Sequence, residues 1–183
     1  LGAALVNAGV VSTVAIDYVL QKQKIEKVLM GNLLVELGFA SAKEVARQLA
    51  DQRGLRFVSA DEMPEPDTAV AGIFNRSLCL TYGFLPVREN DEGLIEVVLG
   101  DAQPDAVTEL VQRKLGKGCH FFQGEFDRVA QAIQQHYYFA EHPPARLIES
   151  EDRKLDADVD RAYSPARLLE HMLHLAVRER ATD

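Results

Sequence analysis

Few residues of this chain have types and spacings typical of catalysis or metal binding. His171 and His174 stand three positions apart beside Glu170, a spacing at which two imidazoles on one helix can share a metal ion. The segment 115–118 (LGKG) has the composition of a phosphate-binding loop, but it lies between an expected helix and an expected strand, the reverse of the required order. Serine-hydrolase and zinc-protease motifs are absent. We therefore predict no catalytic residue and no metal site, and we interpret the two histidines as partly exposed helix residues.

A set of residues in the first fifty recurs at a fixed spacing of 29 positions. Each copy reads L/M-G-x-x-L-x-x-x-G, then six residues, then I/V-x-x-x-L-x-x-Q. Sequence repeats of this kind are structural units that bury their faces on each other. The recurring positions include Gly2, Leu5, Gly9, Ile16, Leu20 and Gln23 in the first copy, and Gly31, Leu34, Gly38, Val45, Leu49 and Gln52 in the second.

Two helices are expected in each copy, which gives a four-helix tandem-repeat unit with pseudo-twofold character. Gly9 and Gly38 follow short apolar segments and are expected to cap them at the C-terminal end. Ser12 and Ser41 are expected as N-caps of the longer helices, and Ser41 with Glu44 forms a capping box.

The glycines Gly2 and Gly31 need another explanation, because glycine early in a helix costs about 1 kcal/mol relative to alanine. Their recurrence indicates that another helix or a ligand approaches the backbone closely. A ligand could use the free N–H groups of a helix start, which favour phosphate. Gln23 and Gln52 are either surface residues or contacts to a polar ligand edge. The three neighbouring lysines are either part of a solvated surface or contacts to a phosphate group: Lys22, Lys24 and Lys27.

The chain is expected to be of the α+β class and to contain four parts. A tandem helical repeat over residues 1–53 precedes an α/β sandwich over 54–139 in the order β-α-β-β-α-β-α, with helices on one face of a mixed sheet. Strands are expected at 55–60, 84–88, 94–99 and 119–123, and helices at 69–82, 105–115 and 126–138.

We expect residues 140–163 to form an acidic linker, because they contain two adjacent prolines and a dense mixture of charges with little hydrophobic periodicity. Residues 164–183 predict an amphipathic helix that begins at Ser164 and Pro165. We expect this helix to be the truncated start of a further domain, and we expect residues to be missing before Leu1.

Composition excludes several classes of protein. The 183 residues are 47% hydrophobic and 26% charged, which is ordinary for a folded protein. With 20 basic and 28 acidic residues, the net charge of −8 argues against a general nucleic-acid surface and against adsorption to anionic lipid. Two cysteines without a C-x-x-C spacing argue against a disulfide scaffold and against a cysteine zinc site. Residues 1–52 carry five basic and five acidic groups, so this part repels an anionic ligand least.

The tandem pattern resembles the N-terminal domain of the ATPases that drive type II secretion and type IV pilus assembly. The family motif is R-L-G-x-x-L-x-x-x-G-x6-L-x3-L-x2-Q in two 24-residue copies with five residues between them, which matches the spacing here. The second copy covers Leu29–Gln52 and the spacer is Lys24–Val28. Four further stretches are similar to the family: Gly54–Val58 (GLRFV), Tyr82–Val87 (YGFLPV), Val97–Asp105 (VVLGDAQPD) and Ser164–Asp183, which resembles the helix leading into the motor's second N-terminal domain.

In a subset of this family the tandem motif binds cyclic di-GMP, and in other members the same region docks on the cytoplasmic domain of an inner-membrane platform protein. The resemblance implies a non-catalytic regulatory or docking domain of a bacterial motor, cytoplasmic and held at the inner membrane by its partners. The full-length protein would be a hexameric ATPase with its own motor domain, without an intrinsic cofactor in this part. The implied cyclic di-GMP positions are the recurring residues: Gly2, Leu5, Gly9, Ile16, Leu20, Gln23, Gly31, Leu34, Gly38, Val45, Leu49 and Gln52.

The chain departs from the family motif where a basic residue should begin each copy. That position is Leu29 in the second copy and lies before Leu1 in the first, and Met30 replaces the usual leucine. An arginine stacks on guanine and pairs with phosphate, whereas leucine does neither. The lost contact costs about 1.5–3 kcal/mol, or roughly ten- to a hundredfold in affinity. Two hypotheses remain: a sensor that binds cyclic di-GMP, and a docking module without nucleotide. Asp101 is an additional candidate to contact a guanine N–H edge.

Overall fold

The computed structural model describes residues 1–141 together with positions 169 and 173. The chain divides into two compact units, Leu1–Gln134 and Gln135–Asp183. The predicted linker and the predicted final helix lie almost entirely outside the described residues, and so do His171 and His174. No helix in the described part of the chain is long and apolar enough to cross a bilayer.

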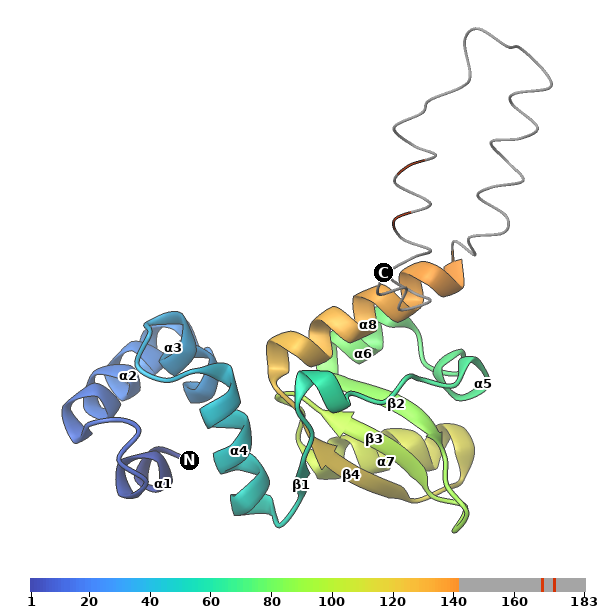
Figure 1. The fold of residues 1–183 in the computed structure, drawn as a ribbon. Coiled ribbons are helices and arrows are strands. Elements are labelled where there is room, and N and C mark those ends of the chain that lie inside the picture. The colour runs from blue at the N-terminus through green and yellow to red at the C-terminus, as the bar shows by residue number, and fades with distance from the viewer. Residues whose placement is uncertain (142–168, 170–172, 174–183) are drawn as a thin grey trace, which may run out of the picture. The chain divides into compact units, whose positions relative to one another are not determined.

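Four helices form the first part of the larger unit (Figure 1). The predicted caps Ser12, Ser41, Gly9 and Gly38 lie at helix ends. The hydroxyl of Ser12 accepts a hydrogen bond from the Ala15 N–H at 3.2 Å, and Ser41 forms a complete capping box with Glu44. Gly9 and Gly38 have φ angles of 69° and 71°, a left-handed conformation that glycine adopts without strain. The bounds are α1 (Gly2–Asn7), α2 (Thr13–Glu26), α3 (Met30–Glu36) and α4 (Ala42–Arg53).

A small apolar core joins the first three helices. Leu5, Leu33 and Leu34 have no exposed surface, and Val19 of α2 is equally buried. Burying a leucine or valine side chain contributes about 1.5–3 kcal/mol relative to leaving it exposed. Because isolated helices of this length are marginal in water, this core is what holds them in place.

A four-stranded mixed sheet follows, which confirms the α+β class (Figure 1). The strand order is β1-β4-β3-β2; β2 and β3 form an antiparallel hairpin, and β4 pairs in parallel with both β3 and β1. The elements after α4 are β1 (Arg56–Phe57), the 3-10 helix η1 (Ala60–Glu62), α5 (Thr68–Ala71), α6 (Arg76–Tyr82), β2 (Phe84–Glu89), β3 (Ile95–Leu99), α7 (Pro104–Leu115), β4 (Cys119–Gln123) and α8 (Phe126–Glu141).

Helices cover both faces of this sheet, so the prediction of helices on one face is wrong (Figure 1). Thr108 of α7 is hydrogen-bonded to Cys119 on one face of β4. On the opposite face, Val129 of α8 lies close to Val98 of β3. A Cβ built on Gly124 would lie 2.9 Å from a methyl group of each valine. All five residues of β3 are consequently buried, the pattern of a strand covered on both sides.

The strand predicted at 55–60 is much shorter than expected, and the helix predicted at 69–82 is two helices. After β1 the Val58 N–H still bonds to the Gln123 carbonyl at 2.9 Å, but Ser59 then begins the 3-10 helix. The longer helix is interrupted at Phe74, whose ring packs edge-on against Phe84 at 5.7 Å in the core. Asn75 restarts the helix by accepting the Leu78 N–H at 2.8 Å.

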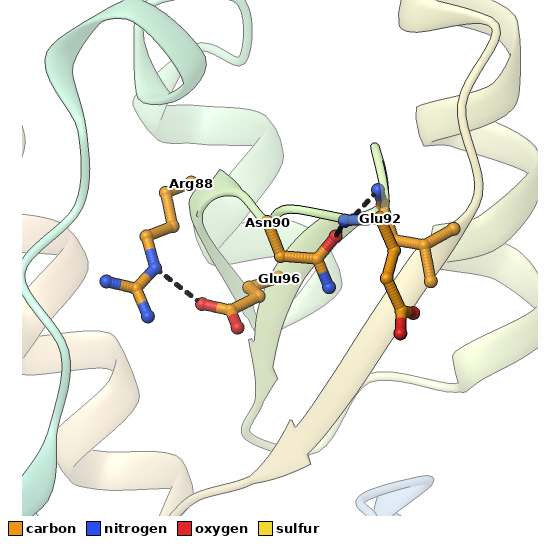
Figure 2. A network of polar contacts seen from close by, with 5 residues as sticks. Arg88, Asn90, Glu92 and Glu96 are labelled. Atoms are coloured by element: carbon orange, nitrogen blue, oxygen red, sulfur yellow. Dashed lines mark hydrogen bonds and ion pairs between the residues drawn. The ribbon is translucent and has the colours of Figure 1, made fainter.

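The turn between β2 and β3 is held by side chains rather than by glycine alone (Figure 2). The Asn90 side-chain oxygen accepts the backbone N–H groups of Glu92 at 3.1 Å and Leu94 at 2.9 Å. Beside the turn, the Arg88 guanidinium donates to Glu96 at 2.8 Å across the two strands. Glu96, whose side chain is 12% exposed, is thereby paired.

Candidate ligand-binding cleft

A cleft of about 570 Å³ lies between the first four helices and the carboxyl ends of β3 and β4. Gly100 and Asp101 follow β3, and Gly124 follows β4. Because β3 and β4 are parallel, their ends meet at the same edge of the sheet, where ligands commonly bind in open α/β sheets. The volume is within the usual range for small-molecule sites.

The starts of four helices line this cleft. They are represented by Gly2 for α1, Met30 for α3, Pro104 for α7 and Phe126 for α8. The N-caps of α3 and α7 make no side-chain cap hydrogen bond within the described residues. Helix starts carry partial positive charge and unsatisfied N–H groups, so their convergence favours an anionic ligand.

The two unexplained glycines allow close helix packing at the wall of the cleft. A Cβ at Gly31 would lie 3.0 Å from Val45 and 3.6 Å from Leu1. A Cβ at Gly2 would lie 3.3 Å from both Ile16 and Met30. Side chains of neighbouring helices therefore account for both glycines, while the same two residues also line the cleft.

Half of the predicted ligand positions line the cleft and half lie elsewhere. Leu5 and Leu34 are fully buried in the core, whereas Gly9 and Gly38 end helices, and a Cβ at either glycine would have no described atom within 4 Å. Ile16 packs under Gly2, and Leu20 is 39% exposed outside the cleft. The predicted residues that line it are Gly2, Gln23, Gly31, Val45, Leu49 and Gln52.

The two recurring glutamines have different surroundings. The Gln23 amide donates to the Val28 carbonyl at 2.8 Å and so fixes the turn between α2 and α3. Gln52 is exposed along the cleft near the end of α4. A ligand can therefore hydrogen-bond the Gln52 side chain directly, whereas a ligand at Gln23 would have to compete with the Val28 carbonyl.

Sequence reasoning missed Arg53, the one basic residue among the described residues that line the cleft. Its guanidinium donates to the Gln123 side-chain oxygen at 2.8 Å. The Gln123 amide in turn donates to the carbonyls of Leu99 at 3.0 Å and Gly100 at 2.6 Å. Burial lowers the pKa of Arg53 below its usual value, and the Asp101 carboxylate opposes this effect. Arg53 follows the repeat directly, but its sequence gives no sign of a partner 70 positions away.

The Asp101 carboxylate lies at the cleft, as one sequence hypothesis required. It accepts a hydrogen bond from the Asn32 amide at 3.4 Å, which joins α3 to the end of β3. Asn32 was not a predicted site residue. Its contact pairs residues 69 positions apart, and such a contact arises only from the tertiary fold.

Comparison with known proteins defines the class of this fold. A family model described as the MshEN domain matches residues 53–143. Among solved structures, MshE with cdg (cyclic di-GMP) has a TM-score of 0.61 at 20% identity, covering 74% of this chain and 97% of that one. The N-terminal domain of XpsE has a TM-score of 0.60 at 20% identity, covering 72% and 90%. The fold is thus that of MshE and XpsE N-terminal domains.

The MshEN match over residues 53–143 confirms the family resemblance, and the matched residues begin directly after the tandem pattern. The chain is 35% identical over 114 residues to the type IV pilus assembly ATPase PilB of Thermus thermophilus, a match that covers 62% of this chain and 13% of that protein. It is 30% identical over 118 residues to bacteriophage adsorption protein B of Escherichia coli, covering 63% and 16%. The chain therefore spans about a seventh of the length of these curated relatives.

Proposed function

We propose that this chain is a non-catalytic regulatory domain whose cleft binds cyclic di-GMP. The observation that carries this proposal is the convergence of four helix starts on a cleft of about 570 Å³, with α3 and α7 lacking side-chain caps among the described residues. Cyclic di-GMP carries two phosphate groups, and helix starts stabilise phosphate without requiring a lysine or arginine.

The rest of the lining suits the purine bases. Leu29, Leu49 and Phe126 give apolar surface on which a guanine face can pack. Gln52 and the Asp101 carboxylate lie where they can hydrogen-bond polar base edges. Arg53 supplies the positive charge that Leu29 lacks, although its bond to Gln123 commits part of that charge to the fold.

The whole protein is proposed to be a bacterial secretion or pilus motor that this domain regulates from the cytoplasmic side of the inner membrane. Similarity to a type IV pilus assembly ATPase and to MshE with cyclic di-GMP supports this context. We propose that the motor is hexameric and contacts the cytoplasmic domain of a platform protein. Similarity to a bacteriophage adsorption protein gives an alternative context, in which the same domain is attached to a protein other than a secretion or pilus motor.

A docking module without nucleotide binding is the second candidate function. Leu29 favours it, because this side chain is 47% exposed at the mouth of the cleft where the family motif has a basic residue. An exposed leucine stabilises a protein interface rather than a phosphate.

Calorimetric titration of the chain with cyclic di-GMP tests the choice. We expect micromolar binding that Leu29→Arg strengthens about ten- to a hundredfold, because the new arginine adds a charge-assisted contact. Gln52→Ala is expected to weaken binding. Lys24→Met is the control and should leave binding unchanged, since Lys24 occupies the position equivalent to Arg53 in the first copy but lies outside the cleft. Absence of heat with both the parent chain and Leu29→Arg would favour the docking module.

A further inference from the structure

Helix α2 has apolar residues on two opposite faces. Ile16 and Val19 on one face are 9% and 0% exposed and belong to the core. On the other face Val14, Tyr18 and Ile25 are 76%, 52% and 82% exposed. A helix at the surface of a folded domain normally places polar residues on its outer face, so this exposed face indicates a contact that the described residues do not make.

The spacing of the exposed face is that of a helix that pairs with another helix. Positions 14, 18, 21 and 25 follow in steps of four, three and four, a heptad seam with Gln21 as its one polar member. Phe39 widens the seam, since its ring contacts Tyr18 edge-on at 6.2 Å and is 37% exposed.

The corresponding face of α4 is mostly polar and exposed, since Lys43, Arg47 and Gly54 are exposed and only Ala50 is buried. Under the 29-residue shift, Tyr18 and Gln21 correspond to Arg47 and Ala50. Ala50 is 1% exposed, and the Arg47 guanidinium lies over the Phe57 ring of β1 at 5.3 Å. The exposed apolar seam of α2 therefore has no apolar counterpart on α4.

Charges beside the seam select the second helix and its direction. Asp17 and Lys24 each precede a seam residue by one position, both are exposed, and both lie on the same flank of α2. In an antiparallel pair of α2 helices, Asp17 of one copy faces Lys24 of the other, twice. A parallel pair would instead bring Asp17 next to Lys22 of the other copy. Lys22, on the other flank, is paired with Glu26 of its own helix at 3.5 Å.

We propose that this face of α2 packs antiparallel against the same face of α2 in a second copy of the chain. The contact is isologous, so one patch complements itself about a two-fold axis near Tyr18 and Gln21. Because α2 has 14 residues, it is about 21 Å long, and the pair buries less than the roughly 800 Å² per partner of a standard interface. We therefore expect a weak dimer that forms at about 100 µM chain.

Sedimentation velocity of the chain between about 5 and 500 µM measures this association. We expect Asp17→Lys and Lys24→Asp each to raise the dissociation constant at least about tenfold, since each turns two attractive pairs into two repulsive ones. The double variant Asp17→Lys/Lys24→Asp restores both pairs with reversed sign, and we expect it to regain the parent association. Both side chains are exposed, and equal melting temperatures of all four proteins would confirm an unchanged fold.

Three outcomes would overturn the proposal. A parent chain that stays monomeric at every concentration means that another protein or another segment covers this face. Association that persists unchanged in both single variants uses a different surface of the chain. A double variant as weak as the single ones excludes the antiparallel pairing of Asp17 with Lys24. None of these outcomes depends on cyclic di-GMP, so this test and the titration above are independent.

Discussion

The two halves of the helical segment share a sequence pattern but have different neighbours. Leu5 and Leu34, which correspond under the 29-residue shift, are both fully buried. Lys24 and Arg53 also correspond, yet Lys24 is exposed while Arg53 is half-buried against Gln123 at the end of the sheet. The repeated residues thus fix a shared core, and the neighbouring sheet decides what the outer face of each half does.

Truncation of the shared core gives the largest expected effect. Leu5→Ala and Leu34→Ala each remove a fully buried side chain, and each should lower the free energy of unfolding by about 2–5 kcal/mol. Urea denaturation followed by circular dichroism measures both. If the halves are equivalent in the core, the two losses agree within about 1 kcal/mol. A much smaller loss for Leu5→Ala would show that α1 adds little to the core.

Removal of the cation that follows each copy should separate the halves. Arg53→Met leaves the buried side-chain oxygen of Gln123 without its 2.8 Å donor, which costs about 1–3 kcal/mol. Lys24→Met at the corresponding exposed position should change stability by less than about 0.5 kcal/mol. Thermal unfolding of the two variants under one buffer condition compares them. Equal losses would mean that the bond between Arg53 and Gln123 contributes nothing measurable.

A methyl group at each packed glycine gives a smaller difference. Gly31→Ala places a Cβ 3.0 Å from Val45 and should destabilise by about 1–2 kcal/mol, since overpacking exceeds the gain in helix propensity. Gly2→Ala meets the flexible Met30 side chain at 3.3 Å and should be neutral within about 0.5 kcal/mol. Urea midpoints at constant slope measure both. Greater damage from Gly2→Ala would reverse our ranking of the two contacts.

Local signals in the sequence predicted most of the fold, because caps and periodicity are local properties. Ser12 and Ser41 begin helices as predicted, and Gly9 and Gly38 end them. The break at Phe74 was missed because the apolar pattern continues through it, while its ring turns into the core against Phe84. Periodicity alone does not distinguish one long helix from two short ones that share a buried side.

The candidate site was half predictable for the same reason. The repeat pointed to the cleft through Gly31, Val45, Leu49 and Gln52 of the second copy. Arg53 and Asn32 were missed, since their partners Gln123 and Asp101 are 70 and 69 positions away. Contacts over such distances depend on how the helices pack on the sheet, which no spacing within the repeat records.

The smallest expected effect concerns the N-caps of the two long helices. Ser41 donates its hydroxyl and backbone N–H to Glu44 at 2.7 and 2.8 Å, and these bonds lower the pKa of Glu44. A carboxyl whose folded pKa is lowered stabilises the fold above its unfolded pKa, about 4.3, and loses that contribution as the pH falls. Because Glu44 is exposed, Glu44→Gln should cost no more than about 0.5 kcal/mol at pH 7 and almost nothing near pH 3. Urea unfolding at both values checks this, with Ser41→Ala as the background in which the pH dependence should shrink but persist, because the backbone N–H at position 41 still donates to Glu44. Helix α2 has Ala15 at the corresponding position, so Ser12→Ala should show the same loss at both pH values, and a pH-dependent loss there would contradict this account of the difference between the halves.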